Sequence, residues 1–330
     1  MQELIAIEKT MKEKASEYLT SGKVDRVIGW KNGELSYDIS PSVFTSAEQI
    51  EKEFVYNDFC GANLSKFLVS ESRKSGKLLV FLKPCDSFSM NQLMTENRVI
   101  RDNIYIIGVP CNGKASYLKL KAKGADGIIS VERNGLEYDV KTVYGEMKLP
   151  VYEIMDDRCL SCKSREVMVF DEMIGENGEP TGVERFDMVE KLENMTPDER
   201  FAFWRSELSK CIRCNACRNA CPACTCEKCV FDNPNSGVEN KAAQTSFEEN
   251  MFHIIRAFHV AGRCTDCGEC SRVCPQNIPL HLLNRKFIKD INSLYGEYQA
   301  GEKAGTRSPL ISYTTDDPDP TDALKRGGKE

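Results

Sequence analysis

The sequence predicts an α/β N-terminal domain with a parallel or mixed sheet, followed by an α-helical domain built around two cysteine-rich loops. Residues 77–82 and 103–108 are short, continuously apolar runs, which are typical of strands buried on both faces of a sheet. Residues 211–222 and 264–275 repeat the pattern CxxCxxCxxxCP. Apolar residues recur at helical spacing between and after these loops. These observations favour two folded units in one chain.

The composition is that of an ordinary globular protein apart from its cysteines. The chain has 330 residues, of which 41% are hydrophobic, 28% are charged and 16 residues are cysteine. No apolar run approaches the roughly 18 residues of a membrane span, and the N-terminus does not resemble a signal peptide. The formal net charge of -6 argues against nucleic acid as a partner. We therefore expect a soluble, cytoplasmic protein whose reduced thiols bind metal.

The N-terminal domain is expected over residues 1–165. Its first helix is amphipathic, its strands are apolar, and a crossover helix joins the first two strands into a βαβ unit. The expected elements are a helix over 1–18, strands over 77–82, 103–108 and 127–131, a crossover helix over 88–98, and a turn over 133–135.

The second half of the chain follows an acidic stretch, punctuated by glycine and proline, that is typical of a linker and is expected over 166–195. The helical domain is expected over 196–300. Its first helix opens with the capping box Thr196-Pro197-Asp198-Glu199, and a later amphipathic helix starts near Ser246. Residues 301–330 are rich in Pro, Asp, Thr and Gly, so a mobile tail is expected there.

The two cysteine-rich loops have the spacing that a pair of 4Fe-4S clusters requires. Three thiolates two residues apart on a tight loop can each reach a different iron, and in two-cluster proteins the cysteine before proline binds the other cluster. A tetrahedral zinc site needs only four ligands and leaves the third CxxC step and the CP unexplained. The expected ligands are Cys211, Cys214, Cys217 and Cys274 for cluster 1, and Cys264, Cys267, Cys270 and Cys221 for cluster 2.

Two further cysteines follow the buried strands through identical Pro-Cys steps. Ligands of an open α/β sheet collect at the carboxyl ends of its strands, so Cys85 and Cys111 should lie at one edge of the sheet. Cys159 and Cys162 form a CxxC after the sheet region, and these four thiols could close around cluster 3. The alternative is that Cys85 and Cys111 are small buried hydrophobic residues.

The remaining four cysteines form a candidate further site. Sixteen cysteines minus the eight of the two loops leave eight, which is the number that two more cubanes would need. A zinc ion, an incomplete cluster, or ligands exchanged during assembly are alternatives. The residues concerned are Cys60, Cys224, Cys226 and Cys229.

Three motifs carry a resemblance to a known family. FLKPCDSFSMNQL, DNIYIIGVPCNG and DRCLSC occur in this order, and over roughly residues 20–165 the chain resembles the beta subunits of deazaflavin-reducing (factor 420) hydrogenases and of formate dehydrogenases. The resemblance implies a 4Fe-4S cluster and FAD. The family's glycine-rich segment associated with the flavin has no counterpart, since the matching stretch reads EKASEYLTSGKVDRV. The second half resembles the helical ferredoxin modules of heterodisulfide-reductase-type and succinate-dehydrogenase-type iron–sulfur subunits.

These features predict an iron–sulfur electron-transfer subunit of a cytoplasmic anaerobic oxidoreductase complex of the formate dehydrogenase, hydrogenase or heterodisulfide-reductase-like kind. Its partners would be other subunits of that complex, including a flavoprotein. No catalytic residue is expected, because the chain has no GxGxxG, P-loop or HExxH, and its three histidines are expected at the surface or in the core. The alternative is a flavin-containing catalytic subunit that reduces a deazaflavin, nicotinamide or ferredoxin partner. A cluster-bearing redox sensor is disfavoured by the acidic charge.

Overall fold

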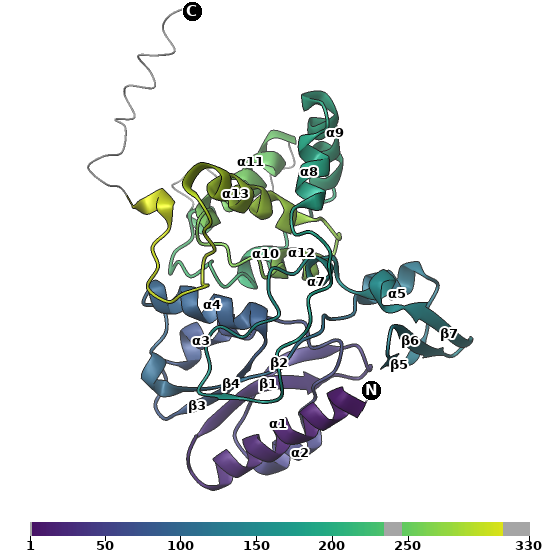
Figure 1. The fold of residues 1–330 in the computed structure, drawn as a ribbon, viewed down its shortest axis with the longest axis vertical. Coiled ribbons are helices and arrows are strands. Elements are labelled where there is room, and N and C mark those ends of the chain that lie inside the picture. Colours follow the sequence, from purple (N-terminus) through teal and green to yellow (C-terminus); the bar gives the residue numbers. More distant parts are fainter. Residues whose placement is uncertain (1, 234–245, 313–330) are drawn as a thin grey trace, which may run out of the picture.

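A five-stranded mixed sheet with helices on both faces forms the N-terminal part of the computed structural model, which describes residues 2–233 and 246–312 (Figure 1). The strand order is β2-β1-β3-β4-β8. β2 pairs antiparallel with β1, and the other neighbours are parallel, so the expectation of a parallel or mixed sheet is confirmed. The strands are β1 (Arg26–Asn32), β2 (Ile39–Phe44), β3 (Leu78–Leu82), β4 (Ile104–Gly108) and β8 (Glu172–Met173).

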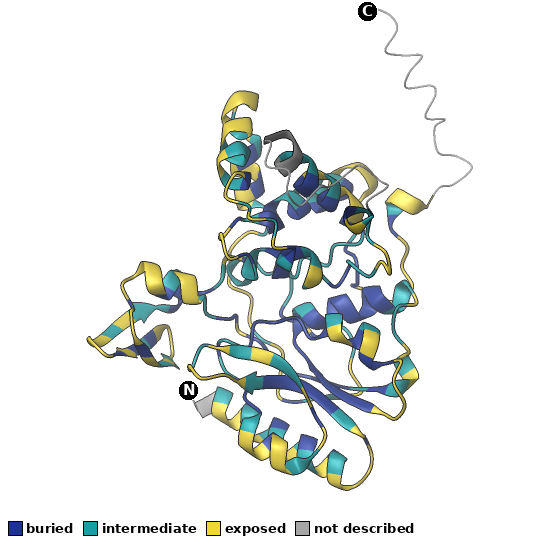
Figure 2. Cartoon of the chain, turned by 180° about the vertical axis from the view of Figure 1, so that it is seen from behind, coloured by how far each residue is buried: buried dark blue, intermediate teal, exposed yellow. Residues whose placement is uncertain are grey.

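The core of this part lies between the sheet and its helices. Helices α1 (Gln2–Thr20) and α2 (Ala47–Glu53) cover one face, and α3 (Ser65–Glu71) and α4 (Pro84–Thr95) cover the other (Figure 1). Every residue of β3 is fully buried (Figure 2), as expected of a strand with helices on both sides. The predicted opening helix is α1, and the two predicted buried strands are β3 and β4.

Helix α4 is the predicted crossover helix, but it begins at Pro84 rather than at residue 88. Proline fits the first helical position, and the backbone N–H of Lys83 donates to the Asp86 carboxylate at 3.1 Å, which caps the helix earlier than the apolar pattern suggests. Its polar residues are buried because the C-terminal helices cover it. Ser89, for example, is fully buried and its hydroxyl lies 2.9 Å from that of Thr265.

A second, antiparallel sheet extends from the side of the molecule (Figure 1). The strand predicted over 127–131 belongs to this sheet and not to the main one. The predicted turn is confirmed, because Gly135 adopts a φ of +62° between two strands. This unit contains α5 (Tyr117–Ala122), β5 (Ile128–Asn134), β6 (Glu137–Thr142), β7 (Gly145–Pro150) and α6 (Val151–Ile154).

The stretch 166–195, expected as a linker, contains two regular elements. β8 adds the last strand of the main sheet beside β4, and α8 (Asp187–Glu193) packs against a C-terminal helix. The Tyr18 hydroxyl donates to the Glu172 carboxylate at 2.7 Å, which ties this strand to α1. The stretch therefore runs back across the sheet before the chain enters the second unit.

The C-terminal helices stack over α4 (Figure 1). The predicted capping box is present at the first long helix, where Thr196 N donates to Glu199 Oε2 at 2.9 Å. These helices are α9 (Pro197–Leu208), α10 (Ala216–Asn219), α11 (Ser246–Val260), α12 (Glu269–Arg272) and α13 (Leu280–Tyr295). The short helix α7 (Asp157–Leu160) precedes β8, and the 3-10 turns of the chain are η1 (Arg101–Asn103), η2 (Val230–Asp232) and η3 (Pro309–Ile311).

The first part of the expected tail packs against the protein. Asn91 of α4 donates a side-chain hydrogen bond to Gly301 O at 3.0 Å, and Gly305 N donates to Thr95 Oγ1 at 2.8 Å. Residues 301–305 therefore lie along α4, and Ser308 lies beside Gly262. The rest of the expected tail, 313–330, lies outside the described residues.

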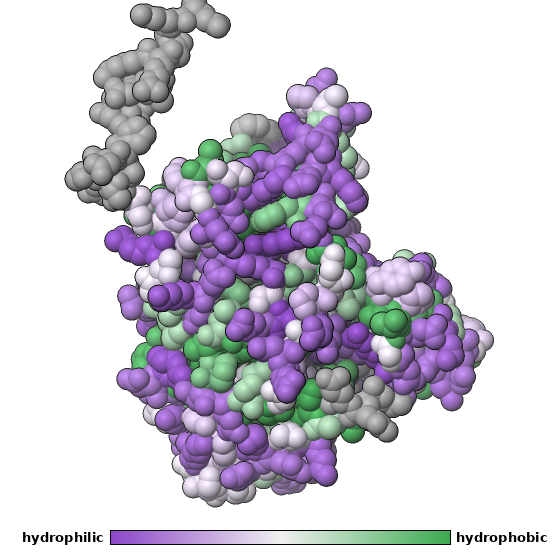
Figure 3. Space-filling model, viewed as in Figure 1, coloured by the Kyte–Doolittle hydropathy of each residue, from purple (hydrophilic) through white to green (hydrophobic). Residues whose placement is uncertain are grey.

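The visible surface is mostly hydrophilic, with hydrophobic side chains in small groups (Figure 3). Among the helices in the described part of the chain, none combines the length and apolar character that a membrane crossing requires.

Candidate metal centres

The two cysteine-rich loops have the same backbone shape. Arg213 and Asn215 flank the second cysteine of the first loop, and both have positive φ, at 52° and 61°. Asp266 and Gly268 occupy the matching positions of the second loop, with φ of 55° and 67°. Left-handed residues on both sides of a cysteine turn the chain back on itself, which is how thiols two residues apart come to face one centre. Each loop then runs into a short helix, α10 or α12, and these two helices contact each other.

One cavity is lined by cysteines from both loops. Cys221, the last cysteine of the first loop, lies on the same cavity as three cysteines of the second loop, namely Cys264, Cys267 and Cys270. This is the set that the crossing of terminal ligands predicted for cluster 2. The side-chain amide of Asn284 on α13 donates to Cys270 Sγ at 3.7 Å, so the neighbouring helix also contacts this group.

The cysteines expected for cluster 1 are also neighbours. Cys217 and Cys274 are buried in one apolar group together with Phe252 and Leu280, and Cys211 packs against it. Burial is the main reason that the pKa of the Cys217 thiol is raised, and the charges of Cys211, Cys274 and Cys214 raise it further. A buried thiol with three further thiols as neighbours is positioned to share one positively charged group with them.

The four cysteines expected for cluster 3 line a single cavity at the carboxyl edge of the sheet. Cys85 and Cys111 follow the parallel neighbours β3 and β4, and Cys159 and Cys162 reach the same cavity from α7 and the residues after it. The cavity also borders Cys267, so the sheet-edge group lies beside the group around Cys221.

Two buried arginines hold these segments together. Arg165 donates to Cys111 O at 3.3 Å and to Cys159 O at 2.7 Å, so one guanidinium joins two of the cysteine-bearing segments. Arg158 donates to Cys267 O at 2.7 Å and to Gly61 O at 2.9 Å. A rigid guanidinium with several donors is suited to fixing carbonyls in this way. The sequence analysis missed both arginines, although each lies within three residues of the CxxC.

Burial disfavours the ionisation of three of the thiols at the sheet edge. Burial raises the pKa of Cys159 to about 12 and raises the pKa of Cys162, and it raises the pKa of Cys85 well above its ordinary value. Thiolates, not thiols, bind metal, so metal binding at this edge must release protons. These cysteines are therefore suited to metal ligation rather than to nucleophilic catalysis.

The last four cysteines do not form one group. Cys224, Cys226 and Cys229 line a cavity of about 310 Å³. Cys60 lies instead in the core of the main sheet, where it is fully buried. Asn57 N donates to Cys60 Sγ at 3.2 Å, and the thiol lies 3.6 Å from Val55 O. Among the described residues, Cys60 thus has local hydrogen-bond partners and lines none of the cavities described above.

The segment that matches the flavin-associated part of the family has no loop at a helix start. It forms the second half of α1 and the turn into β1, and its glycine, Gly22, lies after the helix with a φ of +72°. A glycine-rich loop holds a dinucleotide by bringing backbone N–H groups at a helix N-terminus against its phosphates. These residues do not offer that arrangement for the phosphates of a flavin dinucleotide.

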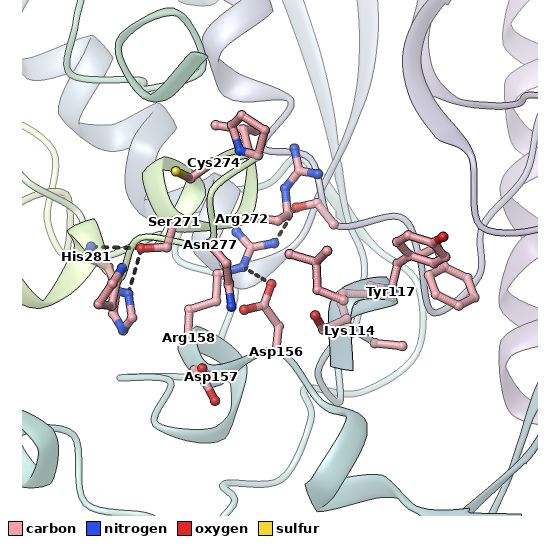
Figure 4. Close-up of a pocket in the computed structure, with 18 of the residues that line it drawn as sticks. Lys114, Tyr117, Asp156, Asp157, Arg158, Ser271, Arg272, Cys274, Asn277 and His281 are labelled. Atoms are coloured by element: carbon pink, nitrogen blue, oxygen red, sulfur yellow. Dashed lines mark hydrogen bonds and ion pairs between the residues drawn. The ribbon is translucent and has the colours of Figure 1, made fainter. Parts of the chain in front are cut away.

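A cavity of about 560 Å³ opens beside Cys274. Figure 4 shows Arg272, Asn277 and Cys274 on one side of it and Tyr117 on the other. The ring of Tyr117 stacks on Tyr37 with centroids 4.4 Å apart. His281 lies at the end opposite Tyr117 (Figure 4), with Nδ1 2.8 Å from Ser271 Oγ, and burial lowers the pKa of this histidine to about 4.

The cysteine groups surround cavities rather than single points. In the part of the chain that the structure describes, no three Cys, His, Asp or Glu side chains converge closely enough to hold one metal ion. A zinc ion needs its ligand atoms about 2.0–2.3 Å from one centre. Cysteines spread around a cavity suit a cluster of several metal ions instead.

The chain is similar to several known iron–sulfur proteins. Residues 207–278 match the model of the 4Fe-4S dicluster domain. The "F420-dependent formate dehydrogenase subunit beta" of Methanocaldococcus jannaschii is 24% identical over 334 residues, which span 83% of this chain and 87% of that protein. The "F420-dependent formate dehydrogenase 1 subunit beta" of Methanococcus maripaludis is 23% identical, over 64% of this chain and 71% of that protein.

Two further comparisons cover less of the chain. The "Succinate dehydrogenase iron-sulfur subunit" of Bacillus subtilis is 35% identical over 93 residues, which are 27% of this chain and 37% of that protein. A solved structure of the F420-reducing [NiFe] hydrogenase complex from Methanosarcina barkeri aligns with 46% of this chain and 58% of that chain, at 18% identity and a TM-score of 0.37. The chain is thus an iron–sulfur protein with a 4Fe-4S dicluster domain, and over most of its length it resembles beta subunits of F420-dependent formate dehydrogenases.

Proposed function

We propose that this chain is the electron-transfer subunit of an oxidoreductase complex and passes single electrons through three 4Fe-4S clusters. The supporting observation is the cavity that Cys221 of the first loop shares with Cys264, Cys267 and Cys270 of the second. An exchange of terminal ligands between two loops is the signature of paired clusters, which lie close enough together for electrons to pass between them. The clusters would supply the redox chemistry.

The protein would hold the three clusters in one series. Clusters 1 and 2 share the two loops, and the proposed cluster 3 at Cys85, Cys111, Cys159 and Cys162 borders Cys267, a proposed ligand of cluster 2. The order would be cluster 3, cluster 2, cluster 1. Such a series can carry electrons from the sheet edge towards Cys274.

The cavity beside Cys274 offers a place where electrons could leave or enter. It exposes one end of the proposed series to a partner, and Lys210 and Arg272 lie on its wall with Asp157 and Glu207. Mixed charges of this kind favour docking of a protein or an ionic carrier by electrostatic complementarity. The partner would be another subunit of a formate dehydrogenase, hydrogenase or heterodisulfide-reductase-like complex, and the names of the two relatives favour a formate dehydrogenase.

The proposal includes a reducing, cytoplasmic setting. All sixteen cysteines are free thiols in the structure. Reduced thiols are the rule in the cytoplasm, whereas secreted proteins favour disulfides.

The test is to purify the full chain without oxygen and to measure iron, acid-labile sulfide, zinc and flavin in one preparation. Three clusters require at least about twelve irons and twelve sulfides per chain, and stepwise reduction should give the EPR signals of coupled 4Fe-4S clusters. A colourless, iron-free preparation would overturn the proposal. A stoichiometric flavin band would instead favour a flavin-containing catalytic subunit.

A further inference from the structure

We propose that Cys224, Cys226 and Cys229 bind one more 4Fe-4S cluster, with His259 as the fourth ligand. The three cysteines and His259 line the same cavity of about 310 Å³. This triplet site does not depend on the assignments of clusters 1 to 3. Cys60, the other candidate in the sequence, lies in the core of the main sheet, and histidine is the alternative ligand that iron–sulfur clusters are known to accept.

The loop that carries the three cysteines is fixed by basic side chains from three separate segments. Lys66 of α3 donates to Cys224 O, and Arg98, after α4, donates to Thr225 O. Arg263, after α11, donates to Ala223 O at 3.0 Å. Charge-assisted hydrogen bonds to three successive carbonyls hold the loop in one conformation. A loop preorganised in this way is what a multinuclear metal site requires.

Helix α11 presents one polar face to the same cavity. Arg256 and His259 are three residues apart on this helix, so both lie on one side, and Arg263 lines the same cavity from the turn that follows α11. The helix therefore places one positive charge and one metal-binding side chain opposite the three thiols. If α11 only packed against the loop through apolar contacts, polar residues would not be needed at these positions.

Arg256 is the observation that points most directly to an anionic occupant. Its side chain lines the cavity and is 3% exposed, yet Nη1 has no hydrogen-bond partner among the described residues. A buried cation with an unmade hydrogen bond is costly, and such a group calls for an explanation. Lys66 adds a second positive charge at the cavity, whereas the guanidinium of Arg263 is already paired with Glu96.

A cluster at this site supplies the missing negative charge. Three cysteines release three protons when they bind, and an oxidised cubane of charge 2+ on three thiolates and a neutral imidazole carries a net charge of about −1. Arg256 Nη1 could then donate to a cluster or cysteinyl sulfur. A zinc ion would require the ligand atoms to converge on one point, and in the described part of the chain no three such side chains do so.

The triplet site adjoins the proposed relay. The backbone N–H of Cys224 donates to Cys221 O at 3.1 Å, and Cys221 also lines the cavity proposed for cluster 2. A cluster at the triplet site would therefore join the series at Cys221, a residue that is far in the sequence from Cys274.

The first experiment compares the full-length wild-type chain with the variant Cys224→Ser/Cys226→Ser/Cys229→Ser, both purified without oxygen. The variant should lose about four irons and four sulfides per chain and keep its zinc content unchanged. Cys60→Ala is the matched control, since it removes a buried cysteine outside the site, and it should retain the full iron content. Equal iron in wild type and triple variant overturns the proposal, and so does a loss of zinc in place of iron.

A second variant guards against a folding defect. His259→Ala changes an exposed side chain and should leave the EPR signals of the relay clusters in place while altering one further signal. An EPR spectrum identical to that of the wild type would exclude His259 as a ligand. Failure of the proposed function is recognised separately. If the chain bound no cluster 1, Cys217→Ser would also leave the iron content unchanged.

Discussion

Arg158 and Glu269 form a buried ion pair that joins the two halves of the molecule. Arg158 Nη1 lies 2.7 Å from Glu269 Oε1, and the two side chains are 4% and 3% exposed. Arg158 precedes Cys159 at the sheet edge, and Glu269 precedes Cys270 in the second loop. Burial alone would raise the pKa of Glu269, but Arg272 and Arg158 outweigh it and lower this pKa to about 2. The carboxylate is therefore ionised and fully paired.

Breaking this pair should destabilise the protein strongly. Arg158→Met leaves Glu269 with one cation, and removing one partner of a buried pair costs about 3–5 kcal/mol. The free energy of unfolding, measured by urea titration of the anaerobic protein, should fall by this amount. Arg101→Met, which removes a half-exposed partner of Asp171, should cost less than about 1 kcal/mol. Equal losses in the two variants would contradict the structural role of Arg158.

The crossing of terminal ligands predicts which variants resemble each other. Cys274→Ser should give the same EPR spectrum as Cys217→Ser, because both residues would bind cluster 1 although they belong to different loops. Cys221→Ser should match Cys270→Ser for the same reason. If Cys274→Ser matched Cys270→Ser instead, each loop would bind its own cluster and the proposed ligand sets would be wrong.

The parts of the fold that local patterns dictate could be predicted from the sequence. β3 and β4 are apolar throughout because both of their faces are covered, and the capping box at Thr196 is a purely local device. The same holds for Cys85 and Cys111, since equal Pro-Cys steps after parallel neighbours lead to one sheet edge.

The parts that depend on distant contacts could not be predicted. β8 is two residues long and exists because it pairs with the edge of β4, so it has no pattern of its own. The strand β5 has the local signature of a strand, but that signature does not say which sheet it joins. Arg158 and Arg165 escaped notice because their partners are carbonyls of segments far away in the chain. Cys60 is grouped with Cys224, Cys226 and Cys229 by counting cysteines, and a count cannot reveal that Cys60 lies in the core of the main sheet.

The ion pair between Lys14 and Glu172 should make the free energy of unfolding fall as the pH rises into the alkaline range. The hydrogen bond to Glu172 raises the pKa of Lys14 despite partial burial. The folded-state pKa of Lys14 is therefore above the ordinary value of about 10.4. The ion pair contributes its full stabilisation below roughly that pH, and this stabilisation is lost as the pH rises through the folded-state pKa. The difference in unfolding free energy between wild type and Lys14→Met should be about 1 kcal/mol or less at pH 8 and should vanish at high pH. A difference that stayed constant up to pH 11 would contradict this assignment.

Two glycines in the segment along α4 should respond differently to alanine. Gly301 and Gly305 both have positive φ, at +79° and +82°, so each substitution carries the cost of left-handed backbone, about 1–2 kcal/mol. A Cβ at Gly301 would lie 1.9 Å from Phe88 O, whereas one at Gly305 meets nothing within 4 Å. Gly301→Ala should therefore detach residues 301–305 from α4 and expose them to limited proteolysis, with a larger loss of stability than Gly305→Ala. Equal cleavage rates in the two variants would mean that the contact between Gly301 and α4 does not hold this segment in place.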